Sequence, residues 1–484
     1  MKFSEWLPDQ DYFENPGLVK ANNVLPSSFY KPFKRLVSQT GTLGEVGCIG
    51  AFSTKDDDGE SLNIAGTKTD LYSLISGTWT SATGGAKPYT TASEFRWVFK
   101  RFGDTIVATN RSNNIQKMDV SGGAFSDLGG SPPRAKFMAV VRDFLVLGNL
   151  NTGANKVQWS GLNDIEEWTP GNKESDLQTF PEGGPITGMI GGEYGLIFQE
   201  NQITRMEYQG PPLNFSFDVI ETGLGAIASG SIVRFGIQTF YLSNNGFYVT
   251  DGSRSYPIGS EKVDKYFFSR ANELALHKMT SAVDPINKLV IWSYVSDDDA
   301  TSNPDRLIIY NWDLKRWSEV STDGVTDPTV KLEHQLIYTS LSEDYTLDEL
   351  DGFGTLSQID TPLDSRFWMG GSIILSAFDG DTKAASFTGE VLPATIALGE
   401  LEINDLQRSI ITQVWPEIDG AVDIKINSRE SHQASSTSSG LIGTNSIGFA
   451  PFAHNGRYHQ IEFSFSGWSR ASGFKIKAEA AGEY

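Results

Sequence analysis

Cysteine is almost absent from this sequence, since Cys48 is the only one among 484 residues. A disulfide within the chain is therefore excluded, and so is a CxxC metal site. We expect Cys48 to be a buried, unreactive thiol. The scarcity of cysteine also fits synthesis in a reducing cytoplasm.

Long apolar runs are absent too. The longest ones, such as Ile373-Ile374-Leu375, have the length of a strand, far below the roughly 20 apolar residues that a membrane-spanning helix needs. The N-terminal stretch MKFSEWLPDQDYFENPG is acidic and has no apolar centre, so it does not resemble a signal peptide. We expect no stable membrane insertion.

Basic residues are outnumbered by acidic ones, 39 against 60, which gives a formal net charge of −21. Nucleic-acid binding over a general basic surface is excluded, because phosphate binding needs clustered Lys and Arg. Two interpretations of the acidity stay open. It can serve solubility alone, or it can provide a surface that DNA passes without adhering.

Known catalytic signatures are missing. The sequence has no GxSxG or SxxK nucleophile motif, no Walker A loop, and no GxGxxG between a strand and a helix. We therefore predict a protein that is not an enzyme, with no catalytic residue and no cofactor-binding residue.

Metal ligation is not indicated either. None of the histidines has zinc-site spacing, and we interpret them as surface or core residues: His277, His334, His432, His454 and His459. The runs Asp56–Asp58 and Asp297–Asp299 lack the spacing of a calcium loop. We interpret both as solvated hairpin loops and predict no metal.

Glycine and aromatic residues are plentiful, with 49 Gly and 12% aromatics, a composition that suits many short strands and tight turns. The clearest example is Tyr194–Tyr208, YGLIFQENQITRMEY, where two apolar runs flank a polar turn. This pattern is typical of a β-hairpin. Asn245-Gly246 lies in another such hairpin and predicts a type I′ turn.

The hairpin pattern recurs about seven times, at intervals that suit the four-stranded blades of a β-propeller. We predict six to eight blades, with a stacked array of sandwiches as the competing architecture. The predicted units are 62–74, 105–118, 144–159, 194–208, 240–249, 289–310 and 336–347.

The two ends of the chain differ from the repeats. Residues 1–45 are rich in proline and aromatics, which predicts an extended arm packed on its own domain or on another surface. Residues 46–380 form the predicted propeller, and 381–484 alternate as in a small antiparallel β-sandwich. Within the repeats, Ser260–Met279 has helical character, with Ser260 as the expected cap and Val263, Phe267 and Leu274 on one face.

Several stretches resemble, in order along the chain, the nozzle proteins of short-tailed bacteriophages, which are also known as packaged-DNA stabilisation or tail hub proteins. The N-terminal elements are WLPDQ, NPGL and ANNV. The later ones are KVQWSGLNDIEEW at Lys156–Trp168, the hairpin at Gly195–Tyr208, a PIG-x-EKVD stretch within Ser243–Lys265, YNWDLKRWS at Tyr310–Ser318, and GRYH, GW and GF within Gly456–Ala478.

The resemblance implies a structural virion protein of the tail, a β-propeller subunit of a six-membered ring below the head-to-tail connector. Its implied partners are further copies of itself, the connector or adaptor protein, tail spikes or fibres and a tail needle. Double-stranded DNA would pass along the ring, be retained there and be ejected without sequence-specific binding. A lumen as acidic as the whole chain would repel DNA phosphates.

Two alternatives stay open from sequence. The first is a propeller hydrolase of polysaccharides, which needs paired carboxylates across a pocket. The second is a propeller that binds glycans without catalysis. Tryptophans could line a sugar groove in either case, although their positions within or beside strands favour core packing; they include Trp97, Trp159, Trp168, Trp292, Trp312 and Trp317.

Overall fold

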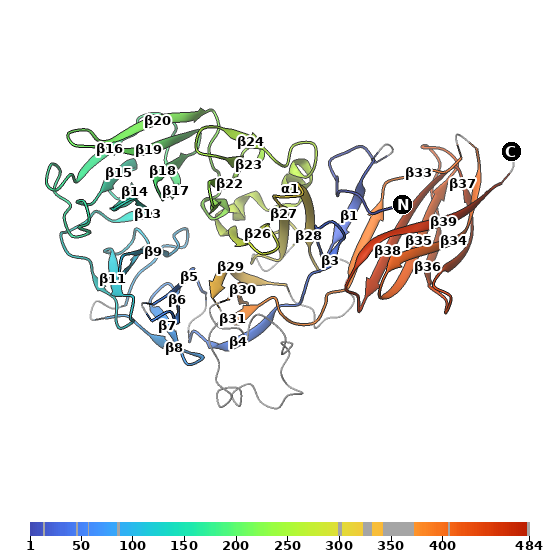
Figure 1. The fold of residues 1–484 in the computed structure, drawn as a ribbon, viewed down its shortest axis with the longest axis horizontal. Coiled ribbons are helices and arrows are strands. Elements are labelled where there is room, and N and C mark those ends of the chain that lie inside the picture. The colour runs from blue at the N-terminus through green and yellow to red at the C-terminus, as the bar shows by residue number, and fades with distance from the viewer. Residues whose placement is uncertain are drawn as a thin grey trace.

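The computed structural model describes residues 1–12, 15–44, 47–56, 58–84, 88–298, 303–322, 332–341, 372–404 and 407–481. It is mainly β, with a seven-bladed propeller at one end and a β-sandwich at the other (Figure 1). Each blade is an antiparallel sheet of four strands. The described part of the chain has no helix with the length and apolarity needed to cross a bilayer.

The first three blades follow one another along the chain. Blade 1 comprises β5 (Gly50–Lys55), β6 (Ser61–Gly66), β7 (Leu71–Ile75) and β8 (Thr78–Ser81). Blade 2 comprises β9 (Val98–Phe102), β10 (Thr105–Thr109), β11 (Gln116–Asp119) and β12 (Ser126–Asp127). Blade 3 comprises β13 (Ala135–Val141), β14 (Phe144–Leu150), β15 (Gly153–Trp159) and β16 (Asp176–Thr179).

The next three blades continue this order. Blade 4 comprises β17 (Ile186–Ile190), β18 (Tyr194–Gln199), β19 (Gln202–Gly210) and β20 (Asn214–Thr222). Blade 5 comprises β21 (Val233–Phe235), β22 (Gln238–Ser243), β23 (Gly246–Thr250) and β24 (Ser255–Pro257). Blade 6 comprises β25 (Thr280–Asp284), β26 (Leu289–Tyr294), β27 (Arg306–Asn311) and β28 (Arg316–Val320).

Blade 7 closes the ring with strands from both ends of the chain. Its order is β29 (His334–Leu341), β30 (Ile373–Asp379), β31 (Lys383–Ser386) and β4 (Val37–Thr42). The topology therefore differs from the expected division in two places. Part of the expected arm, β4, is a propeller strand, and the last propeller residues lie beyond 381 because β31 pairs with both β30 and β4.

The predicted hairpins correspond to the second and third strands of blades 1 to 6. Among these strands, β14 and β26 are buried along their whole length, and they carry strong apolar runs. In the seventh predicted unit, 336–339 lies in β29, the first strand of its blade. The second half of that unit, 345–347, lies outside the described residues.

The hairpin at Asn245-Gly246 is confirmed, but its turn differs from the prediction. The loop residues are Asn244 and Asn245, since Ser243 pairs with Gly246, and it is Gly246 that has a positive φ, 128°. A Cβ atom on Gly246 would lie 2.1 Å from a carboxylate oxygen of Asp264. Glycine is therefore required here by the close approach of Asp264, whose carboxylate accepts a hydrogen bond from Phe247 N at 3.0 Å.

The predicted helical segment is shorter than expected. It consists of α1 (Asp264–Arg270) and the 3-10 turn η2 (Glu273–Lys278), while a second 3-10 turn, η1 (Ser229–Ser231), precedes β21. Ser260 does not cap α1, because the N-cap position is Val263 and it has no side-chain hydrogen bond. Val263 and Phe267 are buried as predicted, whereas Leu274 is 91% exposed because the helix ends before it.

The C-terminal β-sandwich is confirmed. One sheet has the order β32-β38-β35-β36, with β33 also paired to β38, and the other has the order β37-β34-β39. Part of the expected serine-rich loop, 431–440, forms the exposed edge strand β36. The strands are β32 (Ala394–Leu398), β33 (Leu401–Glu402), β34 (Ser409–Ile418), β35 (Ala421–Arg429), β36 (Thr437–Gly443), β37 (Ala450–Gly456), β38 (Tyr458–Ser466) and β39 (Ala471–Ala480).

The N-terminal arm joins the propeller to the sandwich. Strand β1 (Leu18–Asn22) pairs in parallel with β28 of blade 6 and antiparallel with β32 of the sandwich, so a ten-stranded sheet crosses both parts (Figure 1). The short pair β2 (Val24–Leu25) and β3 (Lys31–Pro32) follows. One core cluster contains Trp6 of the arm, Trp317 of blade 6 and Phe463 of the sandwich, which shows that the three parts share a continuous apolar interior.

Candidate functional site

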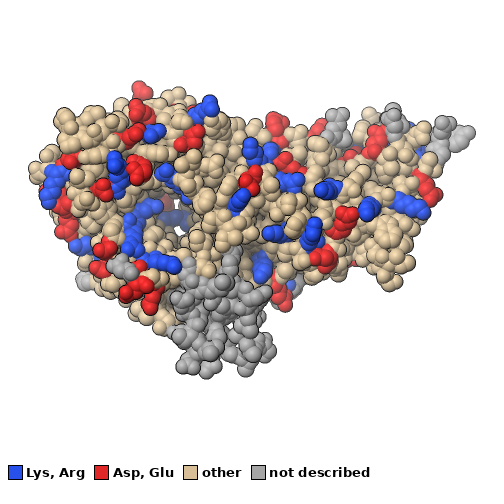
Figure 2. Space-filling model, in the orientation of Figure 1, with Lys and Arg blue, Asp and Glu red and all other residues tan. Residues whose placement is uncertain are grey.

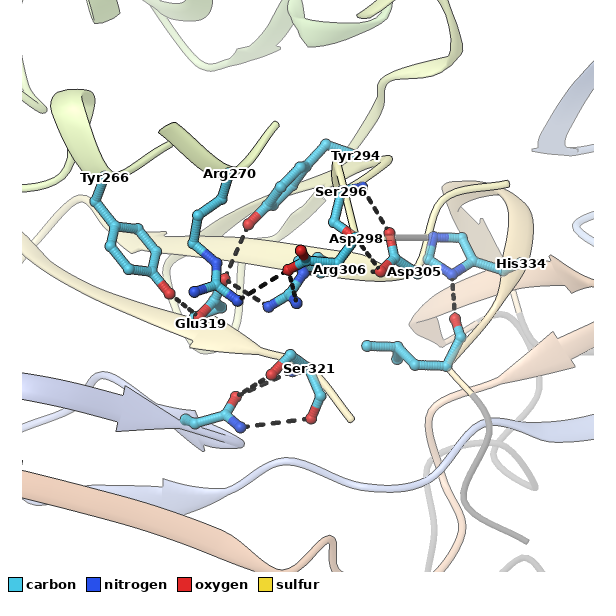
Figure 3. A network of polar contacts seen from close by, with 12 residues as sticks. Tyr266, Arg270, Tyr294, Ser296, Asp298, Asp305, Arg306, Glu319, Ser321 and His334 are labelled. Carbon is cyan, nitrogen blue, oxygen red and sulfur yellow. Dashed lines mark hydrogen bonds and ion pairs between the residues drawn. The ribbon is translucent and has the colours of Figure 1, made fainter. Parts of the chain in front are cut away.

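A buried polar network lies where blade 6 meets α1, and Glu319 on β28 is at its centre (Figure 3). The hydroxyl of Tyr266 donates a hydrogen bond to one carboxylate oxygen of Glu319 at 2.6 Å. The hydroxyl of Tyr294 donates to the other oxygen at 2.9 Å. Both oxygens of this carboxylate are therefore occupied by partners within the protein.

Arg306, at the start of β27, supplies the opposing charge. Its guanidinium lies 3.6 Å from Glu319, 3.6 Å from Asp298 and 3.7 Å from Asp305. The side chains of Arg306 and Glu319 are only 3% and 6% exposed. Arg270 of α1 also reaches Asp298, at 3.7 Å, so the network couples the helix to two strands of the blade (Figure 3).

Burial raises the pKa of Glu319, while hydrogen bonds from the two tyrosines and the charge of Arg306 oppose that rise. The pKa of Tyr266 is raised as well, by its own burial and then by the neighbouring Glu319 charge. A carboxylate held in this way has neither an open side nor a free oxygen for a substrate. The arrangement fixes the position of α1 on blade 6.

Ser321, the residue that follows β28, also holds the arm. The backbone N–H of Ser321 donates to the side-chain oxygens of Asn22 and Asn23 at 3.0 and 3.1 Å. The amide of Asn23 donates in turn to the carbonyl of Pro393, in the segment that leads into the sandwich, at 2.9 Å. Two asparagines of the ANNV element thus connect blade 6, the arm and the sandwich.

The WLPDQ element contacts the start of α1. The Asp9 carboxylate accepts hydrogen bonds from the backbone N–H groups of Lys265 at 2.9 Å and Tyr266 at 2.7 Å. The side chain of Gln10 donates to the carbonyl of Glu261 at 2.6 Å. Because the first N–H groups of a helix lack partners inside it, Asp9 acts as a capping carboxylate supplied from far away in the sequence.

Two of the five histidines lie in the core. His334 Nδ1 donates to the carbonyl of Leu332 at 2.5 Å, and its Nε2 accepts from the hydroxyl of Ser293 at 2.6 Å. Both nitrogens of His459 are bonded to serine hydroxyls, of Ser409 and Ser428. Burial lowers the pKa of each imidazole to about 4, so both are neutral at physiological pH.

The cysteine and the described aspartates of the two acidic runs contact other parts of the protein. Cys48 is buried, and burial raises the pKa of its thiol to about 12. Asp298 is bound by two arginines, and Asp56 accepts from the backbone N–H groups of Asp58 and Glu60, while Asp57 and Asp299 lie outside the described residues. No three His, Cys, Asp or Glu side chains in the described ranges converge as metal ligands would.

The tryptophans pack in cores and against the backbone. Trp159 Nε1 donates to the carbonyl of Glu174, Trp168 Nε1 to that of Ile165, and Trp317 Nε1 to that of Ile258. Trp97, Trp159, Trp168, Trp292 and Trp317 are buried, and Trp312 is partly buried. These positions fit the preference for core packing over a sugar groove.

A second polar region, at the propeller axis, was not identified from the sequence. Figure 2 shows Lys and Arg side chains bordering the central opening on the face in view. Contacts place a group of cations at the end of the axis where the inner strands begin. We call it the axial basic cluster, and it consists of Arg96, Arg111, Lys136, His277 and Lys278.

Sequence reasoning missed both regions because each combines residues that are separated along the chain. The network joins α1 to three strands of blade 6, and the axial basic cluster joins blades 2 and 3 to the segment before blade 6. A local signal exists only for the network of Glu319. Arg306 is a charged residue at the start of the mainly apolar strand β27, and such a position indicates a buried charge that needs a partner.

No protein-family model matches the sequence, and no curated protein is significantly similar to it. Similar solved structures include the N-terminal domain of Nup159, with 9% identity over 76% of this chain and 97% of that one, at a TM-score of 0.40. BamB from Moraxella catarrhalis has 12% identity over 75% and 92%, at 0.37. The computationally designed Ika8 protein has 8% identity over 73% and 99%, at 0.38. These similarities concern the fold alone.

Proposed function

We propose that this chain is a structural, non-enzymatic subunit of the tail of a short-tailed bacteriophage, made in the host cytoplasm and assembled into the virion. In this role it forms the nozzle or hub ring, with six copies, below the head-to-tail connector. The ring extends the DNA channel, retains the packaged genome and takes part in its ejection. It contacts the connector or adaptor, tail spikes or fibres and a tail needle, and DNA passes without sequence-specific binding.

One observation carries the proposal: three of the segments that resemble the nozzle family, in the arm, in Ser243–Lys265 and in Tyr310–Ser318, are far apart in sequence but meet at one junction. WLPDQ contacts the EKVD stretch through Asp9 N, which donates to the carbonyl of Lys262 at 3.1 Å, and Glu5, the residue before WLPDQ, forms an ion pair with Lys262 at 2.5 Å. The YNWDLKRWS stretch bonds the arm, with Asn311 donating to the carbonyl of Pro26 at 2.9 Å and Arg316 to that of Ser27 at 3.1 Å. If these segments resembled the nozzle family only by chance, there would be no reason for them to contact one another in the fold.

A structural role also suits the way the parts are joined. The propeller and the sandwich share a sheet and a core, so they form one rigid body rather than two domains on a linker. The centre of the polar network is closed to solvent and bonded internally. Both features favour a subunit in the wall of the DNA channel over an enzyme that must open to admit a substrate.

The test uses DNA-filled heads that carry their connector but lack this chain. Adding the purified chain is expected to produce a ring of six copies below the connector in electron micrographs. It should also reduce the fraction of the genome that nuclease degrades. A chain that stays monomeric and leaves DNA leakage unchanged would contradict the proposal.

The hydrolase and glycan-binding alternatives are tested in parallel. The chain is incubated with capsular polysaccharide or lipopolysaccharide, and new reducing ends are measured; a glycan array reports binding without turnover. We expect neither signal. Reproducible release of reducing ends would replace the structural role with a hydrolase.

A further inference from the structure

The axial basic cluster brings together cations from blades that are not neighbours. The inner strands follow the order β5, β9, β13 on one side and β25, β29, β5 on the other, so blades 1 and 7 separate blade 2 from blade 6. Arg96, just before β9, nevertheless donates a hydrogen bond to the carbonyl of Lys278, just before β25, at 2.7 Å. This bond reaches across the mouth of the axis and places the Arg96 guanidinium beside the backbone of Lys278.

Two further cations lie against Phe95, the residue before Arg96. The guanidinium of Arg111 is 5.6 Å from the centre of the Phe95 ring, and the ammonium of Lys136 is 5.4 Å from it. Cation–π contacts hold the two charges close together. Within the described residues, no carboxylate lies within ion-pair distance of Lys136, although Glu94 is near enough to favour its charged form.

The cations at the mouth are close enough to lower one another's pKa values. Burial lowers the pKa of His277, and the charges of Arg96, Lys278 and Lys136 lower it further. Burial and then Arg111 lower the pKa of Lys136. Burial lowers the pKa of Arg96 to about 10. Mutual repulsion of this kind is costly, and a bound anion would relieve it.

We propose that the axial basic cluster binds phosphate groups. Arginine and lysine are the usual partners of phosphate oxygens, and several cations together favour a phosphate over a single carboxylate. The rest of this acidic chain repels phosphates, so binding would be confined to the mouth. The inference deepens the proposed function and rests on it for one point, that the phosphates belong to the DNA backbone passing the subunit.

The test compares two charge-matched double variants. K136A/K278A removes two ammonium groups from the cluster, and K475A/K477A removes two exposed ammonium groups from β39 of the sandwich. Binding to a fluorescent DNA duplex is measured by anisotropy over a range of salt concentrations. Thermal melting is measured in inorganic phosphate and in sodium chloride at equal ionic strength.

We expect K136A/K278A to bind the duplex about tenfold more weakly than wild type, and its salt dependence to fall by a slope of about 1–2. K475A/K477A should bind as wild type does. Melting in chloride reports whether each variant is folded. If phosphate stabilises wild type but not K136A/K278A, and no duplex binds, the site is supported and free phosphate is its source.

Equal loss of duplex binding in the two double variants would overturn the site, and so would the absence of any phosphate or duplex effect in wild type. Ring assembly is read out separately by microscopy. A chain that forms rings without binding phosphate would contradict this inference alone. A chain that binds phosphate without forming rings would contradict the tail role alone.

Discussion

The junction of blade 6 and the axial mouth use arginine in opposite ways. At the junction, Arg306 is almost completely buried and lies within 3.7 Å of three carboxylates. At the mouth, Arg96 is half-buried and bonds a main-chain carbonyl, with other cations nearby. The difference teaches that a buried charge surrounded by opposite charges holds the fold together, whereas cations that lie near one another at an opening favour an anionic ligand.

The strongest way to break this comparison is to replace the two arginines with methionine. Arg306→Met removes the buried cation that lies beside the buried carboxylate of Glu319, so we expect a loss of about 3–5 kcal/mol in unfolding free energy. Arg96→Met removes one hydrogen bond at a half-buried site and should cost about 1 kcal/mol. Urea unfolding measures both, and similar losses for the two variants would contradict the distinction.

The next effect concerns pH. His334 and His459 have pKa values of about 4 in the folded protein, below the usual 6.5, so the unfolded chain binds more protons between those values. Stability therefore falls as the pH drops below about 6.5, by about 2 kcal/mol per histidine at pH 5. Asp264 has the opposite effect on stability. Burial raises its pKa to about 7, so the unfolding free energy that it contributes rises as the pH falls below 7 and the carboxylate gains a proton.

The histidine effect is isolated by comparing variants. His459→Gln should flatten the decline in unfolding free energy between pH 7.5 and pH 5, measured by urea titration. His277→Gln is the comparison from the axial mouth, where the side chain is exposed; the pKa of His277 is lowered too, so this variant should flatten the slope, but less than His459→Gln does. An unchanged slope in His459→Gln would show that this imidazole is not kept neutral by the fold.

A smaller effect is expected where the arm contacts α1. Asp9→Asn removes the negative charge that accepts from two N–H groups at the helix start, which should cost about 1 kcal/mol. Limited proteolysis should then cleave the arm faster than in wild type. Glu479→Gln, at an exposed position on β39, is the control and should change neither property.

The smallest effect is expected for Lys136→Gln. Its ammonium has ring contacts but no ion pair among the described residues, so stability in chloride should stay within about 0.5 kcal/mol of wild type. Thermal melting measures this. A large loss would show that Lys136, like Arg306, serves the fold.

Local sequence patterns predicted the repeated strands well, because apolar alternation is a property of neighbouring residues. They could not predict that β4 completes blade 7 or that β1 pairs with β28 and β32, since these pairings join residues hundreds of positions apart. The shorter helix has a similar cause, because Asp9 from the arm supplies the cap that Ser260 was expected to provide.

The candidate sites were less predictable than the fold. The buried histidines fit the expectation of core residues, because an isolated histidine within an apolar strand is usually satisfied there. The axial basic cluster depends on how many blades close the ring, which decides whether Arg96 and Lys278 can meet. The predicted absence of catalytic and cofactor residues stays a prediction.

Strand β1 has a mechanical consequence. One of its edges is hydrogen-bonded to blade 6 and the other to the sandwich, so it belongs to both. A tensile load on the sandwich would reach the propeller through the backbone hydrogen bonds of β1 and the shared apolar core rather than through a slack tether. Rotation of the sandwich against the propeller would have to break these bonds and open the shared core, so the N-terminal arm serves as a brace between the two.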